Sequence, residues 1–182
     1  MNLPNKITIF RMCMIPVFLV FFLIDTIPYG NWIALGIFVI ACLSDAVDGH
    51  LARKHNLVTN FGKFMDPIAD KLLVCAALLC FVERGTLNLI VAIVIVAREF
   101  IIGGLREVAA EGGLVIAASY WGKFKTTAQM IMCCLLIMHL DYGWFTILET
   151  IFIWASFALT VISLLDYLLK NKSVLSTKEK KI

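Results

Sequence analysis

The sequence predicts an all-α, polytopic membrane protein: a bundle of six transmembrane helices with a short amphipathic helix at its N-terminus. Of the 182 residues, 61% are hydrophobic and only 16% are charged, whereas about 25% are charged in an ordinary soluble domain. The apolar residues also fall into runs close to the length of about 20 residues that crosses a bilayer as a helix. A soluble all-α domain is the alternative, and this composition argues against it.

The first element is amphipathic. Leu3, Ile7 and Phe10 recur at helical spacing and leave the polar residues of this segment on another face. We expect this helix to lie in the membrane interface and to run into the first span. Arg11 should then sit near the cytoplasmic end of that span, where it can snorkel to water or meet an anion.

Six apolar runs are separated by short turns that contain polar residues, Gly or Pro, and each run is interpreted as one span. Their approximate bounds are 11–24, 32–53, 64–82, 87–109, 122–140 and 145–169. We expect residues 1–170 to form one membrane domain and residues 171–182 to form a basic cytoplasmic tail. The six cysteines all fall inside apolar runs and form no C-x-x-C pair, which argues against a zinc site or a disulfide framework.

The basic residues indicate the orientation in the membrane. Of the 16 Lys and Arg residues, only Arg84 falls at the end shared by the turns near residues 28, 84 and 142. Because Lys and Arg are enriched in cytoplasmic loops, the opposite end is predicted to be cytoplasmic. An even number of spans then places both termini on the cytoplasmic side.

Four aspartates lie toward the cytoplasmic ends of the second and third spans. Asp45 and Asp48 are three residues apart, and Asp66 and Asp70 are four apart, so each pair shares one face of its helix. A charge inside the hydrocarbon slab costs about 2.5–3.5 kcal/mol, and clustered carboxylates do not all stay ionised without a cation. Oxygen ligands favour Mg²⁺ or Mn²⁺. Four acids suggest two such ions handling a phosphoryl group.

Small residues accompany the aspartates. Gly49 and Ala52 leave a bare strip on the second span, and Gly62 allows a close approach of the loop backbone. Helix–helix packing is the common reason for small residues in membranes. Beside four acids and Arg53, we favour the approach of a phosphate or a nucleotide.

The stretch from residue 45 to residue 70 reads D-x2-D-G-x2-A-R-x8-G-x3-D-x3-D. It resembles, without any departure, the signature of the CDP-alcohol phosphotransferase family of integral membrane enzymes. The resemblance implies transfer of a phosphatidyl-type group from a CDP-linked lipid to an alcohol, with release of CMP. It also implies a six-helix bundle, usually dimeric, with its site at the cytoplasmic face.

The resemblance assigns a role to each signature position. Asp45, Asp48 and Asp66 are expected to hold the two divalent ions, with Asp70 completing the site and acting as general base. The residues expected to line the CDP pocket are Gly49, Ala52, Arg53 and Gly62.

Four further basic residues, Arg98, Arg106, Lys123 and Lys125, lie in the cytoplasmic halves of the fourth and fifth spans. Such a cluster suits a second anion, most simply the phosphate of a phosphorylated acceptor. Anchoring at lipid headgroups is the alternative, and the pair of Arg98 with Glu99 is open to a purely structural reading. The R-E-F and G-K-x-K-T patterns of these spans resemble those of bacterial phosphatidylglycerophosphate synthases, a branch of the family.

That branch implies CDP-diacylglycerol as donor and sn-glycerol 3-phosphate as acceptor, giving phosphatidylglycerophosphate for phosphatidylglycerol and cardiolipin synthesis. It implies a homodimer among the lipids of the bacterial inner membrane, with no nucleic-acid partner. The same reaction with serine, inositol phosphate or phosphatidylglycerol as acceptor stays open. A divalent-cation transporter is an alternative of another class, although the acids lie toward one face and the sequence shows no inverted repeat. A non-catalytic scaffold leaves the four acids unexplained.

Overall fold

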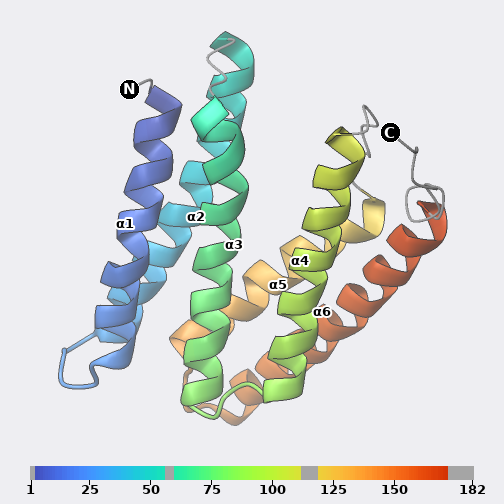
Figure 1. Cartoon of the computed structure of the whole chain (residues 1–182). Helices are drawn as coiled ribbons and strands as arrows, with labels where there is room; N and C mark the ends of the chain where they lie inside the picture. Colours follow the sequence, from blue (N-terminus) through green and yellow to red (C-terminus); the bar gives the residue numbers. More distant parts are fainter. Residues whose placement is uncertain (1–2, 56–59, 112–118, 172–182) are drawn as a thin grey trace. The chain divides into compact units, whose positions relative to one another are not determined.

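The computed structural model of the protein describes residues 3–55, 60–111 and 119–171, and these residues form helices and turns without strands (Figure 1). The six helices within these ranges are α1 Leu3–Leu23, α2 Gly30–His55, α3 Asn60–Glu83, α4 Leu89–Glu111, α5 Tyr120–Met138 and α6 Gly143–Lys170. The all-α prediction and the presence of six helices are therefore confirmed for the described part of the chain.

The predicted N-terminal amphipathic segment runs into the first predicted span as expected, and the two form one continuous helix, α1, from Leu3 to Leu23. Pro16 lies inside α1 and removes one backbone hydrogen bond there without ending the helix. Arg11 is only 1% exposed. Its side chain is therefore buried against other parts of the protein and does not snorkel to the surface.

The chain divides into two compact units. Unit 1 comprises Met1–Leu87 and Cys133–Thr146, and so holds α1, α2, α3 and the end of α5. Unit 2 comprises Asn88–Met132 and Ile147–Ile182, and so holds α4, the first part of α5 and most of α6. A single domain over residues 1–170 stays a prediction, and the predicted tail lies outside the described residues except for Asn171.

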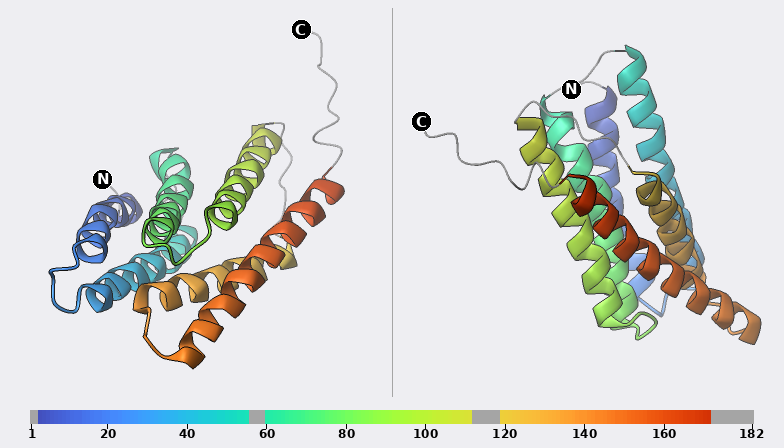
Figure 2. Two further views of the ribbon diagram at one scale, coloured as in Figure 1. Left: turned by 90° about the horizontal axis from the view of Figure 1, so that it is seen from below. Right: turned by 90° about the vertical axis from the view of Figure 1, so that its right-hand side faces the viewer.

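Unit 1 is built on aromatic packing. In this unit α1 contacts both α2 and α3 (Figure 2), and Phe18, Phe22, Phe38 and Phe81 are all fully buried. The ring centroid of Phe22 lies 5.5 Å from that of Phe18 and 5.7 Å from that of Phe81. Such aromatic pairs contribute about 0.5–1.5 kcal/mol each beyond the area that they bury. These side chains come from three helices and fix their packing.

Unit 2 buries polar groups along one face of α6. Ser156, Thr160, Ser163 and Tyr167 are spaced four, three and four residues apart, and none is more than 2% exposed. Residues at these spacings share a helix face. Large apolar side chains such as Trp154 are exposed on α6. The helix therefore directs small polar groups inward, which is the reverse of a helix on the surface of a soluble protein.

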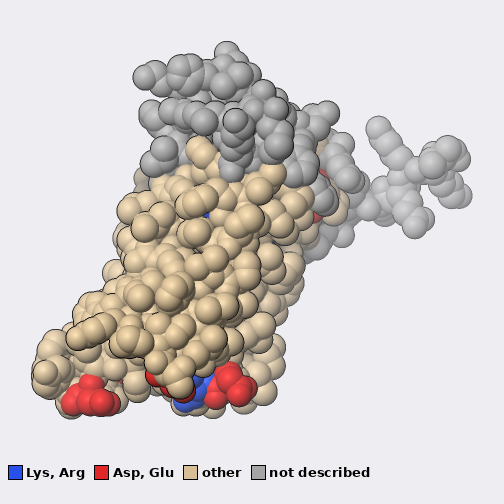
Figure 3. Space-filling model, turned by 90° about the vertical axis from the view of Figure 1, so that its left-hand side faces the viewer, with Lys and Arg blue, Asp and Glu red and all other residues tan. Residues whose placement is uncertain are grey.

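One face of the molecule carries a wide uncharged surface, and the charged side chains visible there gather mainly at one edge (Figure 3). Apolar side chains such as Val20, Ile40 and Leu43 are exposed on α1 and α2. Exposed apolar surface of this kind marks a contact with lipid or with another protein. The surface of unit 1 therefore agrees with a membrane protein better than with a soluble one.

Among the described residues, one helix is long and apolar enough to cross a membrane by itself, α6, with a mean hydropathy of 2.0 over its best stretch. Ile7–Leu23 and Gly30–Ser44 are apolar but shorter. The helices α2, α3, α4 and α5 carry the charged residues that the sequence assigns to the site, and these charges lower their hydropathy. Six membrane spans therefore stay a prediction.

Candidate active site

The signature residues fall on two consecutive helices of unit 1. Asp45, Asp48 and Arg53 belong to the last turns of α2, and Asp66 and Asp70 belong to the first turns of α3. The predicted helical placement of the four aspartates is therefore confirmed. Their side chains lie outside those that the structure describes, so their roles as metal ligands and base stay predictions.

The polar connection between these helices is shorter than predicted. The sequence suggests a loop over residues 54–62, but α2 continues to His55 and α3 begins at Asn60. Gly62 is therefore helical, and so it does not bring a loop backbone close to a ligand as expected. Polar residues extend both helices because each added turn satisfies its own backbone hydrogen bonds. The remaining signature positions, Gly49 and Ala52, lie on the last turns of α2.

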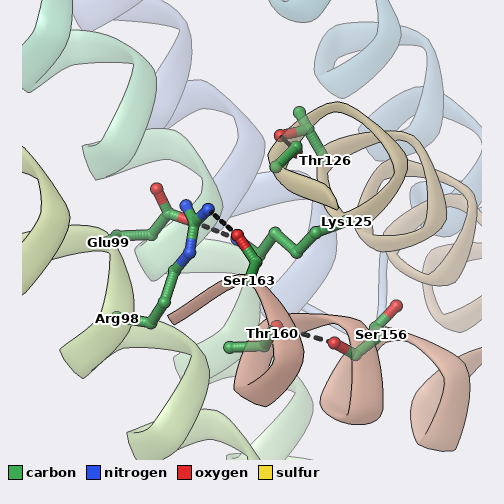
Figure 4. Close-up of polar contacts among 8 residues, drawn as sticks. Arg98, Glu99, Lys125, Thr126, Ser156, Thr160 and Ser163 are labelled. Atoms are coloured by element: carbon green, nitrogen blue, oxygen red, sulfur yellow. Dashed lines mark hydrogen bonds and ion pairs between the residues drawn. The ribbon is translucent and has the colours of Figure 1, made fainter. Parts of the chain in front are cut away.

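In unit 2, two of the four predicted phosphate-binding cations meet on one carboxylate (Figure 4). Arg98 Nη1 donates a hydrogen bond to Glu99 Oε1 over 3.2 Å, and Lys125 Nζ donates to the same oxygen. Arg98 is 8% exposed and Lys125 is 2% exposed. Removing one partner of a buried ion pair is strongly destabilising, so Glu99 is needed to keep both cations buried.

A third helix completes the surroundings of Arg98. Arg98 Nη2 donates a hydrogen bond of 2.6 Å to Ser163 Oγ on α6. Gly122 on α5 lies beside this bond, since a Cβ atom there would be 3.4 Å from Arg98 Nη2. Arg98 Nε is buried and has no hydrogen-bond partner among the described residues. A charged N–H donor without a described acceptor is suited to bind an anionic oxygen of a ligand.

The other two predicted cations are placed differently. Both Arg106 and Lys123 are exposed. The Cζ atom of Arg106 lies 5.7 Å from the ring centroid of Tyr167, and the Nζ atom of Lys123 lies 5.4 Å from the ring centroid of Tyr120. Among the described contacts they pack on tyrosines and do not join the Glu99 cluster. The structure thus brings together Arg98 and Lys125 but not all four cations.

Sequence reasoning missed Ser163 and the role of Gly122 beside Arg98. A signal was present, because Ser156, Thr160 and Ser163 recur at helical spacing within an otherwise apolar run. It also missed a second contact between α6 and the start of α5, where Ser119 Oγ donates a hydrogen bond of 2.7 Å to Asp166 Oδ2. Short polar residues inside apolar helices commonly make contacts between helices in membranes.

The end of unit 1 away from the signature holds an arginine with a different environment. Arg84 Nη1 donates to Asn31 Oδ1 over 3.0 Å, and Nη2 donates to Asp25 Oδ1 over 2.9 Å and to the carbonyl oxygen of Phe22. The guanidinium also lies 4.0 Å from the Phe22 ring centroid. A cavity of about 310 Å³ beside it is lined by Asp25, Asn31 and Arg84 among others. Because both Nη nitrogens donate to protein oxygens, Arg84 ties the turn between α1 and α2 to the end of α3.

Among the side chains that the structure describes, no three His, Cys, Asp or Glu residues form a group able to hold a metal ion. The side chains of the signature aspartates are not among those described. They therefore stay the candidate ligands.

Comparison with known proteins identifies the family. Residues 1–162 match the family model of CDP-alcohol phosphatidyltransferases. A relative from Bacillus subtilis, named CDP-diacylglycerol–glycerol-3-phosphate 3-phosphatidyltransferase, is 42% identical over 97% of this chain and 98% of its own. Relatives with the same name from Haemophilus influenzae and Rickettsia bellii are 42% and 37% identical, over 92% and 91% of this chain and 91% and 93% of their own. The chain therefore belongs to the CDP-alcohol phosphatidyltransferase family.

Proposed function

We propose that this protein transfers the phosphatidyl group of CDP-diacylglycerol to sn-glycerol 3-phosphate and so forms phosphatidylglycerophosphate and CMP. Family membership and the names of relatives that cover 91–97% of the chain support this reaction. The observation in the structure that carries the choice of acceptor is the buried pair of cations, Arg98 and Lys125, held by Glu99. A phosphorylated alcohol suits such a pair. The comparisons give no support to a divalent-cation transporter.

The donor set of the signature fits hard divalent ions. It consists of carboxylates alone, and they occupy the ends of two helices that are joined by residues 56–59. We infer that Asp45, Asp48, Asp66 and Asp70 hold two ions, Mg²⁺ or Mn²⁺. When bound there, the ions would neutralise charge on the diphosphate and on the departing CMP.

The chain's own residues bind the substrates and move one proton. In the proposed step Asp70 accepts the proton of the attacking hydroxyl of the acceptor. The hydroxyl oxygen forms a bond to the phosphorus of the phosphatidyl group while the bond from that phosphorus to the CMP oxygen breaks. Arg98 and Lys125 bind the acceptor phosphate, with Arg106 and Lys123 in a lesser part. The residues proposed to contact the CDP part of the donor are Gly49, Ala52, Arg53 and Gly62.

The membrane arrangement is part of the proposal. We infer six spans in the bacterial inner membrane, with both termini and the active site cytoplasmic, and a homodimer. The exposed apolar side chains of α1, α2 and α6 support burial in lipid, and the placement of Arg84 as the single basic residue at the opposite end supports the orientation. A diacylglycerol donor then keeps its chains in the bilayer while a water-soluble acceptor reaches the site.

The test is a product assay on the purified protein in detergent, with CDP-diacylglycerol, labelled sn-glycerol 3-phosphate and Mg²⁺ or Mn²⁺. We expect labelled phosphatidylglycerophosphate and an equal amount of CMP. A chelator should stop both, and either metal should restore them. Serine, inositol phosphate and phosphatidylglycerol serve as competing acceptors. Turnover with one of these but not with glycerol 3-phosphate would overturn the acceptor, and no CMP with any acceptor would overturn the transferase.

A further inference from the structure

Ser163 lies on α6, far in sequence from every residue of the signature, and its hydroxyl contacts the guanidinium of Arg98. We propose that Ser163 is a positioning residue for acceptor binding. Its hydroxyl fixes the plane of the Arg98 guanidinium, so that the remaining N–H groups of that side chain are held ready for the acceptor's phosphate. This inference rests on the proposed function, in which Arg98 binds that phosphate.

Ser163 orients Arg98 better than Glu99 does. Arg98 and Glu99 are adjacent on α4, and adjacent residues of a helix do not face each other. Their contact is 3.2 Å long, whereas the contact of Arg98 with Ser163 is 2.6 Å and comes from a different helix. A contact from a second helix restrains both the position and the rotation of the guanidinium. The Glu99 carboxylate balances the charge of Arg98, and the Ser163 hydroxyl sets the orientation of the Arg98 guanidinium.

The two contacts leave donors free on the guanidinium. An arginine side chain has five N–H donors in a fixed planar fork, and Arg98 directs one Nη nitrogen to Glu99 and the other to Ser163. Its buried Nε has no hydrogen-bond partner among the described residues. An Nε–H beside an Nη–H is the arrangement that binds two oxygens of a phosphate at once. The Ser163 bond therefore determines where this pair of donors points.

Gly122 leaves the room that this arrangement needs. A Cβ atom at position 122 would lie 3.4 Å from Arg98 Nη2 and 3.8 Å from Ser163 Oγ. Both distances are ordinary van der Waals contact, so a methyl group fits but anything larger would press on the hydrogen bond. By contrast, a Cβ atom at Gly104 on α4 would meet nothing within 4 Å.

The chain offers a matched control for Ser163. Ser156 lies on the same face of α6, is 0% exposed, and its Oγ has no hydrogen-bond partner among the described residues. Removing either hydroxyl deletes one buried oxygen from the same helix. Only Ser163 contacts Arg98, so a difference between the two variants reports on Arg98 and not on packing in α6.

The first experiment compares Ser163→Ala, Ser163→Thr and Ser156→Ala in the full chain by steady-state kinetics. We expect Ser163→Ala to raise the KM for glycerol 3-phosphate by about 3–10-fold, the range for losing one ordinary hydrogen bond, because the change acts on the ligand only through Arg98. The kcat and the KM for CDP-diacylglycerol should change by less than about twofold. Ser163→Thr, which keeps the hydroxyl, should restore the KM, and Ser156→Ala should resemble the wild type.

The second experiment tests whether Ser163 acts through Arg98. In an Arg98→Lys background the donor of the bond to Ser163, Nη2, is gone, so Ser163→Ala should add less than about twofold to the KM. Full additivity of the two changes would overturn the proposal. Gly122→Leu should reproduce the rise in KM of Ser163→Ala, while Gly122→Ala and Gly104→Leu should leave it unchanged.

A binding measurement separates this inference from the proposed function. Glycerol 3-phosphate and inorganic phosphate should each raise the melting temperature of the wild type, because they bind the folded state alone. Ser163→Ala should reduce that rise, measured for each variant from its own melting temperature without ligand. An unchanged KM and an unchanged rise in Ser163→Ala, with both altered in Arg98→Lys, would overturn the role of Ser163 and leave the acceptor site intact. An equal loss of kcat in Ser163→Ala and Ser156→Ala would also overturn it, whereas no effect in Arg98→Lys would overturn the acceptor site itself.

Discussion

The two compact units carry their polar residues in different places. In unit 1 much of the core is aromatic, with Phe18, Phe22 and Phe81 fully buried, although Arg11 of α1 is buried as well. The signature lies at one end and the Arg84 contacts lie at the other. In unit 2 charged and hydroxyl groups are buried between the helices themselves, with Arg98 contacting both Glu99 and Ser163.

The two arginines show what this difference means. Arg84 directs both Nη nitrogens to protein oxygens and stacks on Phe22 at an exposed turn, so its donors are used in holding the fold. Arg98 is more deeply buried and keeps an Nε without a partner among the described residues. Because Arg98 also shares Glu99 with Lys125, we assign the acceptor phosphate to Arg98 and not to Arg84. The following predictions test this division of roles.

The largest effect is expected in the signature of unit 1. Asp70→Asn should lower kcat by about 10²–10⁴-fold, because the amide does not accept the proton of the acceptor hydroxyl. The assay is the formation of labelled phosphatidylglycerophosphate. Asp141→Asn, at an exposed position in the turn before α6, is the matched control and should keep full activity. Full activity in Asp70→Asn would remove the proposed base.

Arg98→Lys should raise the KM for glycerol 3-phosphate by about 10–100-fold, because lysine keeps the charge but loses the planar fork that binds two oxygens. The KM for CDP-diacylglycerol should change much less. Arg84→Lys makes the same chemical change in unit 1 and should alter neither KM. Equal rises in both constants for Arg98→Lys would contradict an acceptor site in unit 2.

The two lysines at the start of α5 should differ. Lys125 is 2% exposed and shares Glu99 with Arg98, whereas Lys123 is exposed and packs on Tyr120. Lys125→Gln should raise the KM for glycerol 3-phosphate by about tenfold, as expected for a charge-assisted contact, and Lys123→Gln by less than about threefold. The same kinetic assay ranks the two variants. A larger effect in Lys123→Gln would place the phosphate nearer the membrane surface.

The smallest effect on catalysis is expected at Arg84. Arg84→Gln should lower the free energy of unfolding by about 1–3 kcal/mol, because acceptors at the turn between α1 and α2 lose their charged donor. The measurement is the melting temperature in detergent, with both KM values as the control. A change in the KM for glycerol 3-phosphate in Arg84→Gln at unaltered stability would contradict a purely structural role for Arg84.

The sequence predicted the helices and the location of the signature residues better than it predicted the contacts of Arg98 in unit 2. The six helices follow from apolar runs, and the sixth, predicted at 145–169, is observed at Gly143–Lys170. The third, predicted to start near residue 64, starts at Asn60, because polar residues extend a helix beyond its apolar run. The signature can be recognised from the sequence alone because its residues are close together in the chain. Arg98, Gly122 and Ser163 come from three helices, so only the fold reveals that they meet.

The contact between Arg98 and Ser163 spans 65 residues, whereas that between Lys125 and Glu99 spans 26 and that between Arg98 and Glu99 spans one. During synthesis, which runs from the N-terminus, the cluster around Arg98 therefore forms in a fixed order: Glu99 is made at once, Lys125 joins Glu99 with α5, and Ser163 joins Arg98 only when α6 is made. The signature helices are complete long before. A ribosome that stops within α6 ahead of Ser163 would leave a chain with the reaction's carboxylates but without the last contact of the arginine that we assign to the acceptor.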